Sequence, residues 1–283
     1  MPLPIIGSGK FSAGSNFLCG ENVIVDVAEE VILGDNCTLS DNAYLGGRRI
    51  EIGNYFYGYS WEWKRLDIGR GRRDEENAVL TVGNRCTFHD NRIDLAHKVE
   101  IGHDVGLSPE AVIYTHYYWQ SVLEGYPCAC APVWISSGAI IGFRSVLLPA
   151  SHVGENTVVG AQSVVTRALL PDSVYAGNPA ELVRGIVPKS SEEQYLWLVA
   201  FIPEYQRTLE YRGLPAQELV RWYCCLRFRN CILDCGAGTI EGTEDEFTDD
   251  LRTFLFRKGI RIYTQRPFKS LARQGSKQFS GDA

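Results

Sequence analysis

Long apolar runs, a secretion signal and an excess of basic residues are all missing from this sequence. The longest uninterrupted apolar stretch in its last third, Leu196–Ile202, has seven residues, whereas a membrane-spanning helix needs roughly 20. The N-terminus lacks the basic start and apolar core of a signal peptide. Lys and Arg number 28 against 34 Asp and Glu, a formal charge of −6, and nucleic-acid binders normally show a basic excess. We therefore expect a cytoplasmic protein that has no membrane span and binds no nucleic acid.

Paired cysteine motifs are also missing, although the chain has nine cysteines. An odd number without a secretion signal indicates reduced thiols rather than a disulfide framework. Two groups of cysteines lack the C-x-x-C spacing of a structural zinc site: the pair Cys128 and Cys130, and the cluster Cys224, Cys225, Cys231 and Cys235. From spacing alone we expect no metal.

What the sequence does contain is an aliphatic residue at every sixth position. Three runs show it: Val27, Leu33, Leu39 and Leu45; Leu95, Ile101, Leu107 and Ile113; and Ile135, Ile141, Leu147, Val153, Val159 and Val165. A period of six fits neither a helix of 3.6 residues per turn nor a lone amphipathic strand. It fits a chain that turns a corner every six residues, so that three short strands complete one coil of a narrow prism.

The corners of this coil are recognisable in the sequence as well. Glycine often follows the aliphatic residue, with Asn, Asp, His or Glu next, as in the segment 33–36, and Gly and Asn adopt positive φ angles at low cost. Cys37 and Cys86 precede Leu39 and Phe88 by two residues, so we expect them in small interior positions. The repeat covers about residues 23–166 and resembles the hexapeptide-repeat family. The period thus predicts a mainly β fold of parallel coils, and the resemblance implies that it is a left-handed parallel β-helix, because the period alone does not show the handedness.

Two segments interrupt the repeat and are predicted to be loop insertions. The first, 55–78, combines aromatic residues that suit a sugar ring with arginines that suit a phosphate-bearing acceptor: Tyr55, Tyr57, Tyr59, Trp61, Trp63, Arg65, Arg70, Arg72 and Arg73. Packing of these aromatics on the coil wall or on a neighbouring subunit is an equal alternative. Ile68 and Gly69 indicate that a degenerate coil persists inside the segment. The second insertion, 114–133, contains His116 two residues after a regular strand position.

Four ordered motifs downstream of His116 make the resemblance more specific. They are similar to the V-W-I-G, P-G-x-x-I-G-x-N, G-A-x-S-V-V-T-K and A-G-x-P-A-x-x-x-R segments of the sugar and xenobiotic O-acetyltransferase branch of the family. The counterparts here are the ranges 133–136, 149–156, 160–167 and 176–184. In those relatives a catalytic histidine lies just upstream, after an aliphatic-x-Thr strand end, and His116 fills that place.

The resemblance implies an acetyl-CoA-dependent acyltransferase whose sites form between adjacent subunits of a homotrimer. His116 is the implied general base, and a neutral imidazole persists near neutral pH. The implied residues for coenzyme A are Trp134, Ser137, Ala161, Thr166, Arg167 and Arg184. Asn91, Asp94 and His89 are candidates for binding the acceptor, which the resemblance implies to be a sugar, a nucleotide sugar or a precursor in polysaccharide biosynthesis.

Three other functions remain open at this point. Acyl transfer to the nitrogen of an amino sugar needs the same base. A zinc-dependent carbonic anhydrase shares the fold, but its H-x₄-H spacing is absent, because successive histidines are 8, 6, 13 and 36 residues apart. A non-catalytic β-helix subunit of a larger assembly is the remaining alternative.

After residue 186 the period of six ends and a second domain, 187–283, is predicted as a C-terminal helical or α/β extension. Ser190 and Glu193 form a capping box that opens a helix to about Tyr211. A second helix is expected from Pro215 to about Phe228, and a third over 243–258. Short strands are expected at 232–234 and 260–263. No catalytic motif is recognisable in this extension.

Overall fold

The computed structural model describes residues 5–6, 9–60 and 64–271. The chain divides into two compact units, unit 1 (Met1–Val187) and unit 2 (Pro188–Ala283). Trp61 and Trp63 of the aromatic insertion lie outside the described residues.

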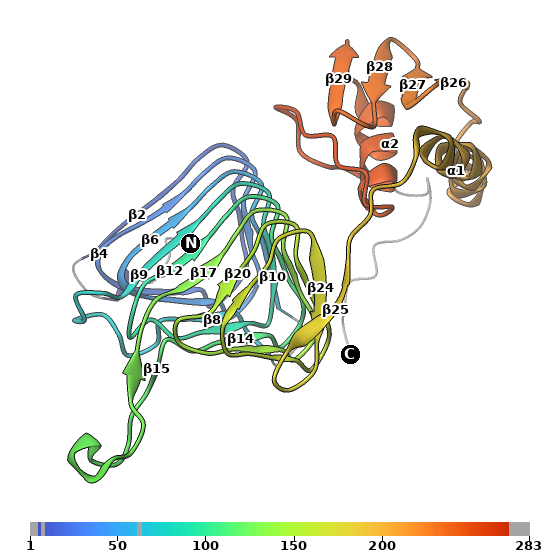
Figure 1. The fold of residues 1–283 in the computed structure, drawn as a ribbon. Helices are drawn as coiled ribbons and strands as arrows, with labels where there is room; N and C mark the ends of the chain where they lie inside the picture. Colours follow the sequence, from blue (N-terminus) through green and yellow to red (C-terminus); the bar gives the residue numbers. More distant parts are fainter. Residues whose placement is uncertain (1–4, 7–8, 61–63, 272–283) are drawn as a thin grey trace. The chain divides into compact units, whose positions relative to one another are not determined.

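Unit 1 is a parallel β-helix with three walls, which follow one another along the chain in the order A, B, C (Figure 1). Wall A contains β2 (Lys10–Ala13), β9 (Val79–Val82), β12 (Val99–Ile101), β17 (Val133–Ile135), β20 (His152–Val153) and β23 (Ala168–Leu169). Wall B contains β3 (Leu18–Cys19), β5 (Thr38–Leu39), β7 (Tyr57–Tyr59), β10 (Thr87–His89), β13 (Gly106–Leu107), β18 (Ile140–Ile141), β21 (Val158–Val159), β24 (Ser173–Ala176) and the antiparallel β25 (Glu181–Gly185).

Wall C contains β1 (Ile5–Ile6), β8 (Asp67–Ile68), β11 (Arg92–Ile93), β14 (Val112–Ile113), β19 (Val146–Leu147) and β22 (Val164–Val165). Two longer strands, β4 (Ile24–Leu33) and β6 (Tyr44–Ile52), pass from wall C to wall A and join the two walls into one sheet. The mainly β, parallel β-helix fold predicted from the period of six is thereby confirmed.

The interior of the prism is formed by the aliphatic residues of the repeat. Every member of the three six-residue runs is at most 4% exposed, and Cys37 and Cys86 are fully buried. Burying one such aliphatic side chain contributes about 1.5–3 kcal/mol. Hydrophobic burial repeated coil after coil therefore stabilises a unit whose strands are often only two residues long.

A ladder of side chains connects successive coils at the corner between walls A and B. Each corner residue accepts a hydrogen bond from a backbone N–H of the coil before it: Asn54 from Asp35, Asn84 from Asn54, His103 from Asn84 and Ser137 from His103. The adjacent corner position is often an Asn with a positive φ, such as Asn36 at 57° and Asn156 at 54°. Backbone amides that no strand pairs are satisfied in this way.

The segment predicted as one insertion, 55–78, retains two strands of the coil. Tyr57 and Tyr59 lie in β7 on wall B, with their rings stacked 6.0 Å apart. Asp67 and Ile68 form β8 on wall C. The aromatic residues that the structure describes therefore pack along the coil wall, and the added length lies in the stretches before β8 and after it.

The second insertion forms an arm that projects from the coil (Figure 1). It consists of the antiparallel pair β15 (His116–Tyr117) and β16 (Ala129–Cys130), with the 3₁₀ helix η1 (Val122–Glu124) between them. Trp119 and Leu123 of this arm are 92% and 94% exposed. His116 thus lies at the base of the arm, next to the coil.

Unit 2 combines two helices with a four-stranded antiparallel sheet. The helices are α1 (Ser191–Tyr211) and α2 (Glu246–Phe256), and the strands are β26 (Leu219–Trp222), β27 (Cys225–Phe228), β28 (Cys231–Asp234) and β29 (Thr239–Gly242). The predicted capping box of α1 is confirmed. The apolar core of unit 2 includes Tyr205, Leu226, Phe228 and Leu251. Neither helix in the described part of the chain is long and apolar enough to cross a bilayer.

Two predictions for the extension are wrong. The range 215–228 contains the hairpin of β26 and β27 rather than a helix, because a two-residue turn with Tyr223 at a φ of 52° reverses the chain there. The range 260–263 is not a strand. Its buried Ile262 packs in the core of unit 2, and its carbonyl accepts a hydrogen bond from the buried Arg252.

Two glycines after β8 allow a matched test of this packing. A Cβ on Gly69 would lie 2.2 Å from the carbonyl oxygen of Gly46, whereas a Cβ on Gly71 would meet nothing within 4 Å; both have positive φ. Gly69→Ala should therefore lower the free energy of unfolding by about 3 kcal/mol or more, and Gly71→Ala by only about 1–2 kcal/mol. Denaturant unfolding measures both, and equal losses would contradict the packing of β8 against β6.

Candidate active site

Three successive coils bring Arg72, Asp94 and His116 together at the corner between walls C and A. The strands before them are paired in register, with Ile68 beside Ile93 and Ile93 beside Ile113. Asp94 directly follows β11, and His116 begins the arm after β14. Parallel register therefore stacks residues that are far apart in the sequence.

Asp94 and His116 form a hydrogen-bonded pair. The Asp94 Oδ2 atom lies 2.7 Å from His116 Nδ1 and accepts a second hydrogen bond, also 2.7 Å, from the Thr115 hydroxyl. An ionised carboxylate only accepts hydrogen bonds, so Nδ1 of a neutral His116 carries the hydrogen and Nε2 keeps its lone pair. Buried Thr115 fixes the carboxylate. The pair thus fixes the imidazole ring with Nε2 as its hydrogen-bond acceptor.

Arg72 completes the cluster. Its Nε donates to Asp94 Oδ1 at 3.1 Å, and its Nη2 lies 3.1 Å from His116 Nε2 and 3.3 Å from Nδ1. The guanidinium nitrogen is thus nearly equidistant from the two ring nitrogens, which places it against the ring rather than along the lone pair of either one. Arg72 also forms an ion pair with Glu75.

The charges of the cluster reinforce one another. Burial raises the pKa of Asp94, but hydrogen bonds from Thr115 and His116 and the charge of Arg72 outweigh burial, so the pKa lies below its ordinary value. Burial likewise opposes the charge of Arg72, yet hydrogen bonds to Glu75 and Tyr118 and the charge of Asp94 raise its pKa. Asp94 is therefore ionised and Arg72 is protonated at neutral pH.

A polar cavity of about 330 Å³ opens in front of this cluster. Besides the three residues of the cluster, it is lined by Asp67, Arg70, Gly71, Arg92, Ile93 and Tyr114. Arg70 is held by Asp67 at 2.9 Å and lies over the ring of Tyr44. Charged and polar side chains thus surround most of this cavity.

The predicted coenzyme A residues occupy different walls and corners of this one chain. Trp134 lies on wall A and lines a shallow cavity of about 550 Å³ with Glu100 and His152. Thr166 and Arg167 follow β22, at the same corner as His116 but further along the coil. The others lie elsewhere: Ser137 between walls A and B, Ala161 between walls B and C, and Arg184 in β25. One chain alone does not gather them around His116.

Of the predicted acceptor residues, Asp94 lines the cavity in front of His116, and His89 and Asn91 do not. Asn91 is fully buried, and its amide donates to the carbonyls of Ser108 and Ala111. His89 lies at the end of β10 against the ring of Tyr59, where burial lowers its pKa. Both residues lie near the corner between walls B and C, one wall away from His116.

Sequence reasoning missed Thr115 and the particular role of Arg72. A signal was present, because Arg72, Asp94 and His116 are evenly spaced at 22 residues. The interval of 22 residues corresponds to one coil of about 18 residues plus about four residues that are added at the corners. Evenly spaced polar residues at a corner that carries insertions are therefore a usable signal for a site.

The lowered pKa of Asp94 predicts how its contribution to stability depends on pH. A carboxyl with a depressed folded pKa stabilises the protein above the ordinary pKa, and the contribution is lost as pH falls through the folded value. Asp94→Asn should lower the free energy of unfolding by about 1–3 kcal/mol at pH 7, and the gap to the wild type should narrow below about pH 4.

Denaturant unfolding at several pH values measures this gap. Glu100→Gln is the matched control, because Glu100 is exposed and forms a surface ion pair with Lys98, and such pairs contribute little to stability. If the difference in the free energy of unfolding between wild type and Asp94→Asn stayed constant down to pH 3, the lowered pKa of Asp94 would be contradicted.

Comparison with known proteins identifies relatives over part of the chain. No family model matches. A Saccharomyces cerevisiae protein named "Putative acetyltransferase YJL218W" is 37% identical over 116 residues, which are 40% of this chain and 59% of that protein. A Staphylococcus aureus protein with the same description, SAV2555, is 43% identical over 63 residues, which are 22% of this chain and 31% of that protein. The chain thus spans less than two thirds of the length of these relatives.

Among solved structures, a maltose O-acetyltransferase from Clostridium difficile 630 is 23% identical, with a TM-score of 0.32 over 65% of this chain and 70% of its own. The hexapeptide-repeat acetyltransferase VCA0836 from Vibrio cholerae is also 23% identical, with a TM-score of 0.36 over 38% of this chain and 64% of its own. The sequence relatives agree with the resemblance that the motifs indicated: over part of its length, this chain is similar to proteins described as acetyltransferases.

Proposed function

We propose that the protein is an acyltransferase that moves an acyl group, with acetyl the leading candidate, from coenzyme A to a hydroxyl of a sugar or polysaccharide precursor. The observation that carries this proposal is the hydrogen-bonded pair of Asp94 and His116 at the edge of a polar cavity. The sequence relatives, which are described as acetyltransferases, support it.

In the proposed reaction His116 acts as general base. Its Nε2 accepts the proton of the acceptor hydroxyl while the oxygen attacks the thioester carbonyl. The tetrahedral intermediate then collapses, the carbon–sulfur bond breaks, and the proton on Nε2 passes to the departing thiolate of coenzyme A. Asp94 holds Nδ1–H and stabilises the imidazolium that forms. Asp94 is thus a positioning residue rather than a base.

Arg72 is proposed to hold the pair in place. Its Nη2 lies 3.1 and 3.3 Å from the two ring nitrogens of His116, so the guanidinium contacts the ring and leaves the Nε2 lone pair open to the acceptor hydroxyl. Arg70 and Arg92 line the same cavity and are placed to donate hydrogen bonds to sugar oxygens. Asp94 and the arginines form the proposed acceptor subsite; His89 and Asn91 are proposed to act only through the shape of the neighbouring corner.

The donor side is proposed to come from two copies of the chain in a homotrimer. In that arrangement the corner carrying His116, Thr166 and Arg167 meets a different corner of an adjacent copy. Ser137 of that copy would offer its backbone N–H to the oxyanion, with Trp134, Ala161 and Arg184 along the rest of coenzyme A. The exposed side chains of the arm support such a contact, because large exposed apolar surfaces mark interfaces.

Removing the base tests the reaction. His116→Ala should lower the rate of acyl transfer by about 10²–10⁴-fold. It should lower the melting temperature less than the loss of a buried aliphatic side chain would. Release of free thiol from acetyl-CoA, measured with a panel of sugars, amino sugars and nucleotide sugars, gives the rate. Product analysis on the best acceptor separates transfer to oxygen from transfer to nitrogen.

The matched control is His103→Asn. His103 occupies a rung of the corner ladder that Asn fills at positions 54 and 84, so this variant should keep full activity. Equal activity of His116→Ala and wild type on a well-used acceptor would rule out the proposed base. A wild type that releases no thiol with any acceptor would favour a non-catalytic assembly subunit.

The arm tests the proposed trimer. Trp119→Ser combined with Leu123→Ser should shift the protein from trimer towards monomer in sedimentation velocity, because both side chains are almost fully exposed in one chain. Leu18→Ser is the control, since Leu18 is also an exposed leucine (65%) but lies on wall B away from the arm. A monomeric wild type, or a double variant that stays trimeric, would contradict the arm as an assembly contact.

A further inference from the structure

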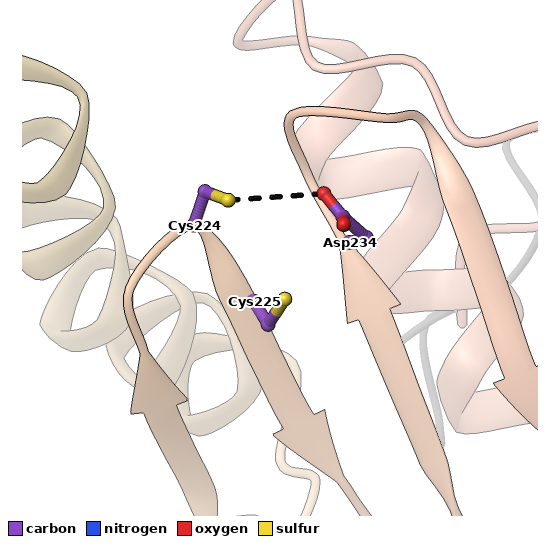
Figure 2. Close-up of side chains that lie close together, drawn as sticks. All are labelled: Cys224, Cys225 and Asp234. Carbon is purple, nitrogen blue, oxygen red and sulfur yellow. Dashed lines mark hydrogen bonds between the residues drawn. The ribbon is translucent and has the colours of Figure 1, made fainter. Parts of the chain in front are cut away.

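Unit 2 contains a group of metal-ligand side chains that no function described so far uses. The Sγ atoms of Cys224 and Cys225 and a carboxylate oxygen of Asp234 all lie within 4.8 Å of one another (Figure 2). Spacing along the sequence indicated no metal here. We propose that these three residues bind a thiophilic divalent cation, with zinc as the matching ion.

The fold of the sheet explains how the three side chains converge. Cys225 on β27 is directly opposite Asp234 on β28 in the antiparallel register, and side chains of such a pair point to the same face of the sheet. Cys224 lies in the two-residue turn before β27, and Figure 2 shows its sulfur directed towards Asp234. Two adjacent cysteines thus reach one carboxylate because the turn rotates the first of them.

The carboxylate is held in place by its surroundings. The backbone N–H groups of Gly236 and Ala237 donate to Asp234 Oδ1 at 2.9 and 2.8 Å, and the Cys235 N–H donates to the carbonyl of Cys224 at 3.0 Å. Hydrogen bonds of this kind orient metal-binding ligands. A Cβ on residue 236 would lie 3.4 Å from both Asp234 Oδ1 and Cys224 Sγ, in ordinary van der Waals contact, so Gly236 lies directly beside both ligand atoms.

The donor set points to the type of cation. Two sulfurs and one oxygen suit zinc, whereas magnesium and calcium prefer oxygen ligands alone. Tetrahedral coordination places ligand atoms about 3.5 Å apart, so the three side chains need to move by only about 1 Å. On binding, both thiols lose their protons to solvent, and two thiolates, one carboxylate and a divalent ion leave a net charge of −1.

A neighbouring cavity supplies compensation for that charge and a fourth position. It has a volume of about 690 Å³ and is lined by Cys224, Cys235 and Gly236 together with Lys189 and Lys258. Lys258 forms an ion pair with Glu204, which also lines the cavity, so the positive charge beside the negatively charged site comes from Lys189. Three protein ligands leave one coordination position for water, as in exchangeable zinc sites. The proposal does not depend on the acyltransferase reaction.

Metal content of the full-length protein tests the site. After purification under reducing conditions and incubation with zinc, elemental analysis should find about one zinc per chain, and cobalt in its place should give thiolate-to-metal charge-transfer absorption. Cys224→Ser, Cys225→Ser and Asp234→Asn should each weaken binding by at least about tenfold. Zinc should raise the melting temperature of wild type, because a ligand of the folded state stabilises it, and should release protons into a weakly buffered solution.

The double variant Cys128→Ser with Cys130→Ser is the matched control, since it removes two exposed thiols from unit 1 and should keep the zinc. The variant Cys235→Ser should keep the zinc as well. If Cys235→Ser lost the zinc, the ligand set of three residues would be wrong. The proposed site would be wrong if the wild type, with its thiols reduced, bound less than about a tenth of an equivalent of zinc and its melting temperature did not change when zinc was added. A disulfide between these thiols that forms in preference to zinc binding under mild reduction would overturn it too.

Discussion

Parallel register between successive coils is the constraint on which unit 1 depends. Each coil donates its strand N–H groups to the next, and the corner ladder from Asp35 to Ser137 continues that bonding where the strands end. Because the strands of one wall stay in register, a strand position in one coil lies directly over the equivalent position in the next. One or two buried aliphatic residues per strand then suffice, since equivalent residues of successive coils stack along the inside of each wall.

The same register creates the candidate site. An isolated histidine on an arm would have no defined tautomer, but here the coil below supplies Asp94 and the coil below that supplies Arg72. Insertions are tolerated only at corners, because residues added inside a strand would displace the interior row. The corner between walls C and A carries both the turn with Arg72 and the arm with His116, so chemistry and added length coincide there.

Much of unit 1 could be predicted from the sequence because its determinants are local and repeated. The period of six identified the buried residues, and the motifs around residues 133–184 directed attention to His116. Arg72 and Thr115 were missed because their roles depend on which coil lies above which, and that depends on how many residues each corner absorbs. In unit 2 the helix with a capping box was predicted correctly, whereas 215–228 was not. A proline followed by mixed apolar residues is compatible with a helix start, and only the pairing of β26 with β27 decides for strands.

The cysteine cluster was missed for the same reason, because it depends on strand pairing. A spacing rule such as C-x-x-C detects ligands that one tight turn presents together, and it does not detect ligands that meet across a pair of strands. Cys225 and Asp234 are nine positions apart, yet the hairpin of β27 and β28 places them opposite each other. Adjacent cysteines normally point to opposite faces of a strand, which argues against a shared ion when the sequence is considered alone. The positive φ of Tyr223 removes that obstacle, because it places Cys224 in the turn rather than in the strand. In both units, therefore, strand register rather than distance along the chain determines which reactive side chains come together.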